Sequence, residues 1–274
     1  MTSIRWTDKT WNFIAGCTIK SAGCTNCYAM KMATRIANMG HVEHYQGVTD
    51  TKTWTWTGHV NLAPRHVMEE PLKRRKPTMY FVNSMSDWLH EQVKEEWLSA
   101  AFDICEASPH HVFQWLTKRP ERMSEVLDSI GRRRVPENCW MGVTVEGSNI
   151  DPVTKLPVTD RIPMLREGVD AKYRWISFEP LISDPGSVDL TGIHWSVIGG
   201  ESGHGARLMR SAWAYSLIDQ SKAHGLAVHF KQWGTAKGAN PDPTDPTVRH
   251  KGGHRVRGLY WNEYPDGVER VLKD

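Results

Sequence analysis

The chain has 274 residues, of which 39% are apolar and 24% are charged. This composition predicts a soluble globular protein with a sizeable core. The length is that of one (β/α) barrel with additions. The net charge of 34 − 31 = +3 is too small for a generally polyanion-binding surface, so any nucleic-acid interface has to be local. No run approaches the roughly 20 apolar residues of a membrane helix, and the first residues lack the apolar core of a signal peptide, so we expect no membrane partner and a cytoplasmic location.

Short β-rich runs alternate with helix-like segments along most of the chain. The expected strands are 10–15, 79–82, 112–116, 140–145, 174–178, 195–198 and 228–233. The expected helices are 27–39, 94–107, 120–130 and 211–224. This alternation predicts an α/β fold, a full or partial (β/α) barrel of about six to seven parallel strands. We assign residues 1–234 to it, with an insertion near 41–60, and residues 235–274 to a C-terminal extension with a small hairpin packed on the barrel.

The stretch GCTIKSAGCTNCYA places three of the five cysteines, Cys17, Cys24 and Cys27, in the loop after the first expected strand. Barrel enzymes carry their catalytic residues at that end of the strands. An odd number of cysteines without an export signal favours metal or redox chemistry over a disulfide framework. A structural zinc site needs four ligands, and the nearest candidates for a fourth are His41 and His44. A four-iron cluster on three thiolates instead leaves one iron open to another ligand.

Six blocks carry a resemblance to a known family: SIRWTDKTWNFIAGCTIKSAGCTNCYAMKMA, NSMSDW, LTKRP, SFEPL, GGESG and FKQWG. Together they span Ser3 to Gly234 and resemble a phage-associated group of three-cysteine proteins that is described as radical SAM-like. The spacing here is C-x6-C-x2-C, whereas that superfamily usually has C-x3-C-x2-C. The usual aromatic residue before the last cysteine is Asn26 here, and Tyr28 follows that cysteine.

This resemblance implies a radical SAM-like barrel and a radical enzyme. Cys17, Cys24 and Cys27 would bind a [4Fe-4S] cluster, and S-adenosylmethionine (SAM) would chelate the open iron. Reduction, by a reductant protein in the cell, then cleaves SAM and starts the radical modification or repair of a substrate. The phage association favours a nucleic acid or nucleotide as that substrate.

Polar residues at the ends of the later strands are candidates for binding SAM. Gly199, Gly200 and Glu201 resemble the superfamily's GGE element for the SAM amino group, although a tight turn before a helix explains them equally well. The other cofactor-binding candidates are Asn83, Ser84, Thr144, Glu146 and Lys118. Their oxygens and the lysine suit a ribose and a carboxylate or phosphate. A helix cap is the alternative for the NSMSD segment.

Glu179 and Lys231 are the candidates for catalysis, because a charged group at the carboxyl end of a barrel strand is more often functional than one on a helix face. The basic runs KRRK, RRR and RHKGGHRVR, with Trp54 and Trp56, offer phosphate contacts and stacking surfaces, or simply a solvated face. Two function classes therefore remain: a radical SAM-type enzyme, and a zinc-stabilised nucleic-acid-binding protein without catalysis. A hydrolase or lyase using Glu179 and a histidine ranks last.

Overall fold

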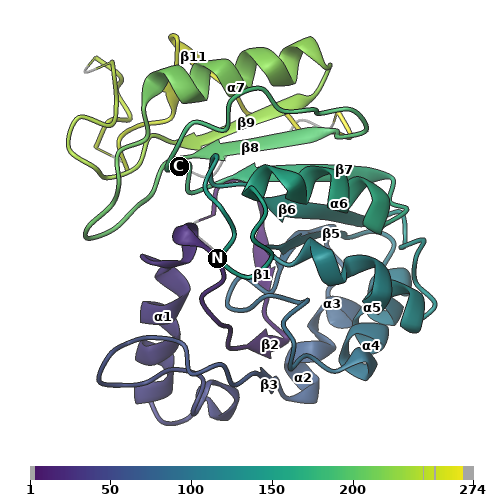
Figure 1. Cartoon of the computed structure of the whole chain (residues 1–274). Helices are drawn as coiled ribbons and strands as arrows, with labels where there is room; N and C mark the ends of the chain where they lie inside the picture. The colour runs from purple at the N-terminus through teal and green to yellow at the C-terminus, as the bar shows by residue number, and fades with distance from the viewer. Residues whose placement is uncertain (1–3, 243, 250, 268–274) are drawn as a thin grey trace. The chain divides into compact units, whose positions relative to one another are not determined.

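The computed structural model describes residues 4–242, 244–249 and 251–267 (Figure 1). The chain divides into two compact units. Unit 1 comprises Met1–Ile19, Cys27–Gly142 and Glu167–Lys172. Unit 2 comprises Lys20–Asn26, Val143–Arg166 and Tyr173–Asp274. In the described part of the chain, no helix is both long and apolar enough to cross a membrane.

The main sheet has seven strands in the order β1-β4-β5-β6-β7-β8-β9. Their bounds are β1 Lys9–Trp11, β4 Met79–Val82, β5 Val112–Thr117, β6 Cys139–Thr144, β7 Tyr173–Phe178, β8 Trp195–Gly199 and β9 Ala227–Gln232. Strand pairs are parallel within each unit, and the order has β1 and β9 at its ends. This is the strand order of a partial (β/α) barrel, so the predicted α/β fold is confirmed. Six of the seven expected strands are found to within one residue.

The helices follow the expected alternation. The α-helices are α1 Tyr28–Asn38, α2 Arg65–Met68, α3 Glu70–Lys73, α4 Glu95–Glu106, α5 Met123–Ser129, α6 Arg161–Gly168 and α7 Ser211–Ala223. Short 3-10 turns are η1 Ala22–Cys24, η2 Glu43–Tyr45, η3 Pro120–Arg122 and η4 Val158–Asp160. In α4, two glutamates in the first turn complement the helix dipole, and the buried residues recur at helical spacing.

Unit 1 has an aromatic core beside β1, β4 and β5. Strand β4 is buried along its whole length, as expected of a parallel strand covered on both faces. Trp115 of β5 stacks on Phe102 of α4 with ring centroids 4.5 Å apart, and Trp88 meets Trp115 edge-on at 5.4 Å. Such pairs stabilise a core beyond the area they bury. Much of the unusual tryptophan content therefore serves packing rather than ligand stacking.

The first expected strand, 10–15, is divided into two elements. Its beginning, β1, pairs with β4, whereas β2 (Ile14–Ala15) pairs antiparallel with β3 (Asn61–Leu62). At the break, Asn83 takes a left-handed conformation (φ 54°), and its Oδ1 accepts the backbone N–H of Ile14 at 3.1 Å. A side-chain acceptor thus replaces the sheet ladder, which lets the chain turn away from β4.

The segment expected as an insertion supplies the packing partner of α1. Ala29, Ala33 and Ala37 on α1 are buried in one cluster with residues that include Tyr45 and Val48. Within that segment, Trp56 packs partly on this cluster and Trp54 is 38% exposed, so the expected pair of exposed tryptophans is reduced to Trp54.

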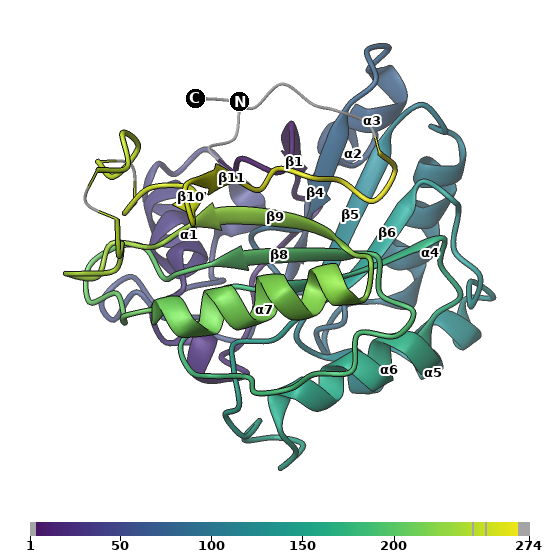
Figure 2. The same ribbon diagram turned by 90° about the horizontal axis from the view of Figure 1, so that it is seen from above.

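Unit 2 is built on β7, β8 and β9, and Figure 2 shows α7 running along β8 and β9. The predicted C-terminal hairpin is present as β10 (Arg255–Val256) and β11 (Leu259–Tyr260), which pair antiparallel. The chain after this hairpin returns beside β9, where the N–H of Phe230 donates to the carbonyl of Trp261 at 2.8 Å. The domain boundary expected after residue 234 stays a prediction.

Candidate functional site

The loop that carries the three cysteines starts where the strands of unit 1 end. The N–H of Gly16 donates to the carbonyl of Met85, beyond the end of β4, at 3.2 Å. Gly16 has φ 104°, and a Cβ there would lie 2.1 Å from the carbonyl oxygen of His59. Only glycine fits this conformation and this close approach. The neighbouring Cys17 is thereby fixed at the carboxyl ends of β1 and β4.

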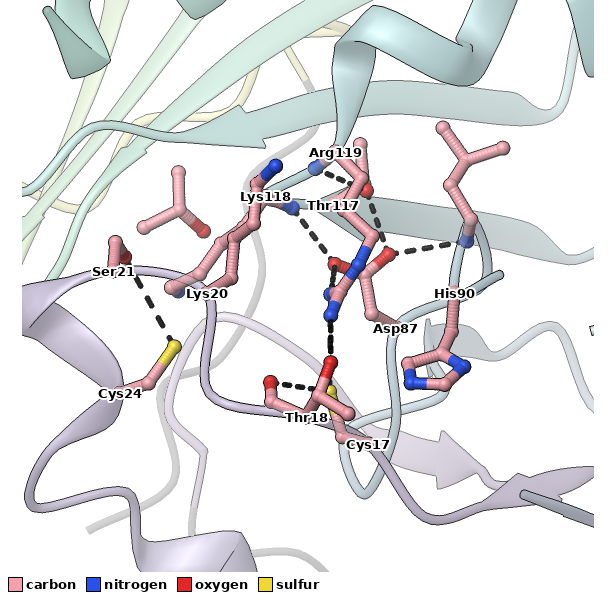
Figure 3. Close-up of polar contacts among 12 residues, drawn as sticks. Cys17, Thr18, Lys20, Ser21, Cys24, Asp87, His90, Thr117, Lys118 and Arg119 are labelled. Carbon is pink, nitrogen blue, oxygen red and sulfur yellow. Dashed lines mark hydrogen bonds and ion pairs between the residues drawn. The ribbon is translucent and has the colours of Figure 1, made fainter. Parts of the chain in front are cut away.

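Arg119 connects this start of the loop to the end of β5. The residue is 2% exposed, and its Nη1 donates to Oδ2 of Asp87 at 2.9 Å. Its Nη2 donates to Oγ1 of Thr18, and Nη1 lies 3.9 Å from Sγ of Cys17 (Figure 3). The guanidinium therefore contacts the loop at two successive residues.

Asp87 holds the guanidinium in place. Its carboxylate accepts hydrogen bonds from Oγ1 of Thr117 at 2.6 Å and from the backbone N–H of Lys118 at 3.0 Å. Burial alone would raise the pKa of Asp87, but Arg119, Thr117 and the backbone donors lower it below its ordinary value. The same pairing raises the pKa of Arg119 although burial opposes it. Asp87 and Arg119 thus form a buried ion pair.

The next part of the loop, Lys20–Asn26, belongs to unit 2 and is anchored there by charged side chains. Oγ of Ser21 donates to Oε1 of Glu146, a residue that is 0% exposed. Arg161 donates from Nη1 to Oε2 of Glu146 at 3.0 Å and from Nη2 to Oδ2 of Asp151 at 2.9 Å. Nζ of Lys20 lies 3.6 Å from Oδ1 of Asp151. Two buried cations and two buried carboxylates are therefore matched in this network.

The same segment is also held by a second ion pair of unit 2. Arg207 donates from Nε to Oε2 of Glu201 at 2.9 Å and from Nη1 to the carbonyl of Ala22 at 2.9 Å. Nδ2 of Asn26 donates to Oε2 of Glu201 at 3.1 Å. Burial would raise the pKa of Glu201, but Arg207 and Asn26 lower it. Glu201 thus faces the cysteine loop as an ionised carboxylate that already has partners.

The cofactor-binding candidates have structural contacts of their own. A Cβ on Gly200 would lie 2.0 Å from the carbonyl oxygen of Trp233, so this glycine allows two backbone segments of unit 2 to touch. Thr144 ends β6, and its carbonyl accepts Nη1 of Arg161 at 2.9 Å. Oγ of Ser84 donates to Oδ1 of Asn12 at 3.0 Å. Nδ2 of Asn83 is buried and has no hydrogen-bond partner among the residues that the structure describes. Their roles as cofactor ligands stay predictions.

The two catalytic candidates lie together in unit 2. Nζ of Lys231 donates to Oε1 of Glu179, and Nε2 of Gln232 lies 3.5 Å from the same oxygen. Glu179 is joined to Pro180 by a cis peptide bond, and a Cβ on Gly199 would lie 3.3 Å from Cδ of Glu179. The side chains of Glu179 and Lys231, near the ends of two strands, thus form an ion pair. Their part in catalysis stays a prediction.

The donor chemistry of the loop fits a thiolate-bound metal group. All five cysteines carry thiols rather than disulfides, and the Arg119 guanidinium beside Cys17 favours a thiolate. Cys17 and Cys27 lie in unit 1, whereas Cys24 lies in unit 2. Among the described residues, no group of three or more His, Cys, Asp or Glu side chains is close enough together to hold a metal ion. The cysteines' role as cluster ligands therefore stays a prediction.

One predicted phosphate-binding run is largely neutralised. Arg132 pairs with Asp103 and with Glu106, and Arg133 pairs with Asp128 at 2.9 Å. Arginines that are already matched by carboxylates offer little surplus charge to a nucleic acid. In the run KRRK, by contrast, the exposed residues are Lys73, Arg75 and Lys76.

Sequence patterns missed three residues that fix the loop: Asp151, Arg161 and Arg207. Arg207 contacts Ala22 across 185 positions of the chain, and Arg161 contacts Glu146 across 15. No local motif marks such pairs, because the two partners lie on separate segments that only the folded chain brings together. The one sequence signal for these residues was an excess of charged residues near the ends of the expected strands.

Comparisons with known proteins give a family and a distant fold likeness. No curated protein matches the chain. Two solved structures of spore photoproduct lyase variants are similar to it, with 11% and 10% sequence identity and a TM-score of 0.43 each. In both, the match covers 77% of this chain and 59% of the other, so the chain spans less than two thirds of their length. A family model matches residues 1–265, so the chain belongs to the family described as "Protein of unknown function (DUF5131)".

Proposed function

We propose that the chain is a radical SAM-type enzyme that uses a [4Fe-4S] cluster and SAM to start the modification or repair of a substrate, with a nucleic acid or nucleotide as the substrate class. The observation that supports this most is the loop with Cys17, Cys24 and Cys27. It begins at the carboxyl ends of β1 and β4 and contains three thiols and no fourth cysteine. Three thiolates on a four-iron cluster leave one iron for a ligand that is not protein.

In this proposal the three cysteines hold the cluster, and the charged residues around the loop keep it in place. When bound, the cluster and SAM supply a radical that takes a hydrogen atom from the substrate. Gly199, Gly200 and Glu201 are the proposed contacts of the SAM amino group, and the pair of Glu179 with Lys231 is the proposed catalytic group. Arg207 and Asn26 lower the pKa of Glu201 against the effect of burial and so keep it ionised, and the SAM ammonium would share this carboxylate with them.

The test of the cofactor is anaerobic purification and reconstitution, followed by iron and sulfide analysis. We expect about four irons per chain, and 5′-deoxyadenosine after addition of dithionite and SAM. Cys24→Ser should lose most of the iron, whereas Cys105→Ala, which alters a fully buried thiol on α4, should keep it. One zinc per chain without iron would overturn the proposal in favour of a zinc-stabilised binding protein. Four irons without SAM cleavage would also overturn it.

The test of the substrate class is binding of labelled DNA and RNA oligonucleotides, measured by fluorescence anisotropy at two salt concentrations. Phosphate contacts predict affinity that falls steeply with salt. Replacing the exposed Lys73, Arg75 and Lys76 with serine should weaken binding. The matched control replaces the arginines of 132–134, of which Arg132 and Arg133 are paired with carboxylates, and should weaken binding less. Absence of binding at low salt would contradict this substrate class.

A further inference from the structure

Arg119 contacts the start of the cysteine loop although the two lie far apart in the sequence. Arg119 comes directly after the β5 region, yet its guanidinium reaches Thr18 and the sulfur of Cys17, about a hundred positions earlier. All of these residues belong to unit 1. Figure 3 shows the guanidinium between Asp87 and Thr18, with the Cys17 sulfur alongside.

Two carboxylates fix the orientation of this guanidinium. Nη1 donates to Asp87 at 2.9 Å, and Nε donates to Oε1 of Glu91 at 3.2 Å. Asp87 is itself fixed by Thr117 and by the N–H of Leu89 at 3.1 Å. With the planar fork held in this way, Nη2 donates to Oγ1 of Thr18, and Nη1 also lies beside the sulfur of Cys17.

The charge at this position is permanent and close to the sulfur. Arginine keeps its proton under all conditions in which proteins fold. Arg119 is 2% exposed, so solvent screens its charge less than it screens that of an exposed cation. Asp87 is buried beside it, whereas the side chain of Glu91 is 56% exposed and its charge is more strongly screened.

We propose that Arg119 is a positioning residue that fixes the Cys17 end of the loop through Thr18 and raises the reduction potential of the cluster bound at Cys17. The inference rests on the proposed function. Reduction adds one electron to the cluster, and a fixed positive charge beside one of its sulfur ligands stabilises the more negative, reduced state. Net charge and hydrogen bonds to the sulfurs are established determinants of such potentials.

The experiment compares the reduction potential of the reconstituted full chain with that of four variants. Potentials are measured anaerobically by stepwise one-electron reduction with dithionite, followed by electron paramagnetic resonance. Arg119→Met removes the charge and should lower the potential. Asp87→Asn keeps the shape but leaves Arg119 less compensated, so it should raise the potential. Arg119→Lys keeps the charge and should stay closer to wild type than Arg119→Met.

Arg122→Met is the matched control. Arg119 is the N-cap of the 3-10 turn η3, and Arg122 ends that turn and donates to the carbonyl of Leu89, so its loss removes a nearby cation that contacts no cysteine among the described residues. Its potential should stay near that of wild type. Because a variant can fail to take up iron, hydrogen exchange of the peptide around residues 16–19 is measured in the iron-free protein. Arg119→Met should speed that exchange, and Arg122→Met should not.

The outcomes separate this inference from the proposed function. A wild-type protein that takes up no iron overturns the proposed function, whatever the variants do. A loaded wild type with opposite shifts in Arg119→Met and Asp87→Asn supports the role of Arg119. Shifts of the same sign, or potentials in Arg119→Met equal to those of Arg122→Met, would overturn that role and leave the proposed function standing. If Arg119→Met does not load, the sign of the Asp87→Asn shift decides.

Discussion

Replacing Arg161 with methionine removes the guanidinium that joins two buried carboxylates in unit 2. Nη1 of Arg161 serves Glu146 and the carbonyl of Thr144, and Nη2 serves Asp151, each at 2.9 to 3.0 Å. Methionine keeps much of the apolar stem but provides no donor. Glu146 then retains the hydroxyl of Ser21, and Asp151 retains Lys20 at 3.6 Å.

Removing one partner of a buried ion pair costs about 3–5 kcal/mol, because the other charge stays buried without compensation. Two carboxylates lose a partner here, but each keeps at least one other polar contact. Asp151 also accepts the N–H groups of Val153 at 2.9 Å and Thr154 at 3.2 Å. We therefore expect Arg161→Met to lower the free energy of unfolding by about 4 kcal/mol, within the range for a single broken pair.

The measurement is urea unfolding of the iron-free protein, followed by tryptophan fluorescence and extrapolated linearly to water. Arg166→Met is the matched control, because Arg166 lies on the same helix and binds the carbonyl of Thr191 at the surface. Its loss should cost less than about 1 kcal/mol. In a double-mutant cycle, Arg161→Met and Glu146→Gln should be coupled by about 1–3 kcal/mol. A cost for Arg161→Met as small as that of Arg166→Met would refute the reasoning.

Two further predictions concern pH and backbone packing. Buried His111 accepts the N–H of Thr78 at 3.2 Å, and burial together with His110 lowers its pKa from 6.5, against the opposing effects of Glu70 and two backbone carbonyls. The contribution of His111 to stability is therefore present above about pH 6.5 and is lost as the pH falls below that value. His111→Asn should therefore lose less unfolding free energy on acidification than the wild-type protein. Equal losses in both proteins would contradict this. Gly200→Ala should destabilise the iron-free protein by about 3 kcal/mol, because its Cβ meets the carbonyl of Trp233, whereas Gly186→Ala, with φ 69° and no atom within 4 Å, should cost about 1–2 kcal/mol. Unchanged stability of Gly200→Ala would contradict this expected clash.

The sequence predicts this fold well where a pattern is local. Strand β4 is a short apolar run bounded by polar residues, and α4 repeats its apolar residues at helical spacing, so both were predictable. The division of the first strand was not, because it depends on Asn83, which lies 69 positions from its partner Ile14. The cysteine loop can be recognised in the sequence from its residue types alone.

The surroundings of that loop were much less predictable than its cysteines. Glu146 was expected to reach a ribose, and that role stays a prediction; what the sequence did not indicate is that this carboxylate is fully buried and bound by Ser21 and Arg161. The sequence does not distinguish a strand-end carboxylate that binds a ligand from one that balances a buried cation. Its cationic partner, Arg161, lies 15 residues later and on another element, so no local pattern reveals the contact.

The long first gap of the cysteine motif has a physical explanation in these anchors. Lys20 and Ser21, which lie inside that gap, are each 2% exposed and bind Asp151 and Glu146. A Cβ on Gly23 would lie 2.5 Å from Cγ of Glu146, so the chain passes directly over this carboxylate. Without Lys20, the buried carboxylates of Glu146 and Asp151 would have one cation fewer, which is costly. The six-residue gap thus contains Lys20 and Ser21, which bind two buried carboxylates, while the grouping of Cys17 with the other two thiols stays a prediction.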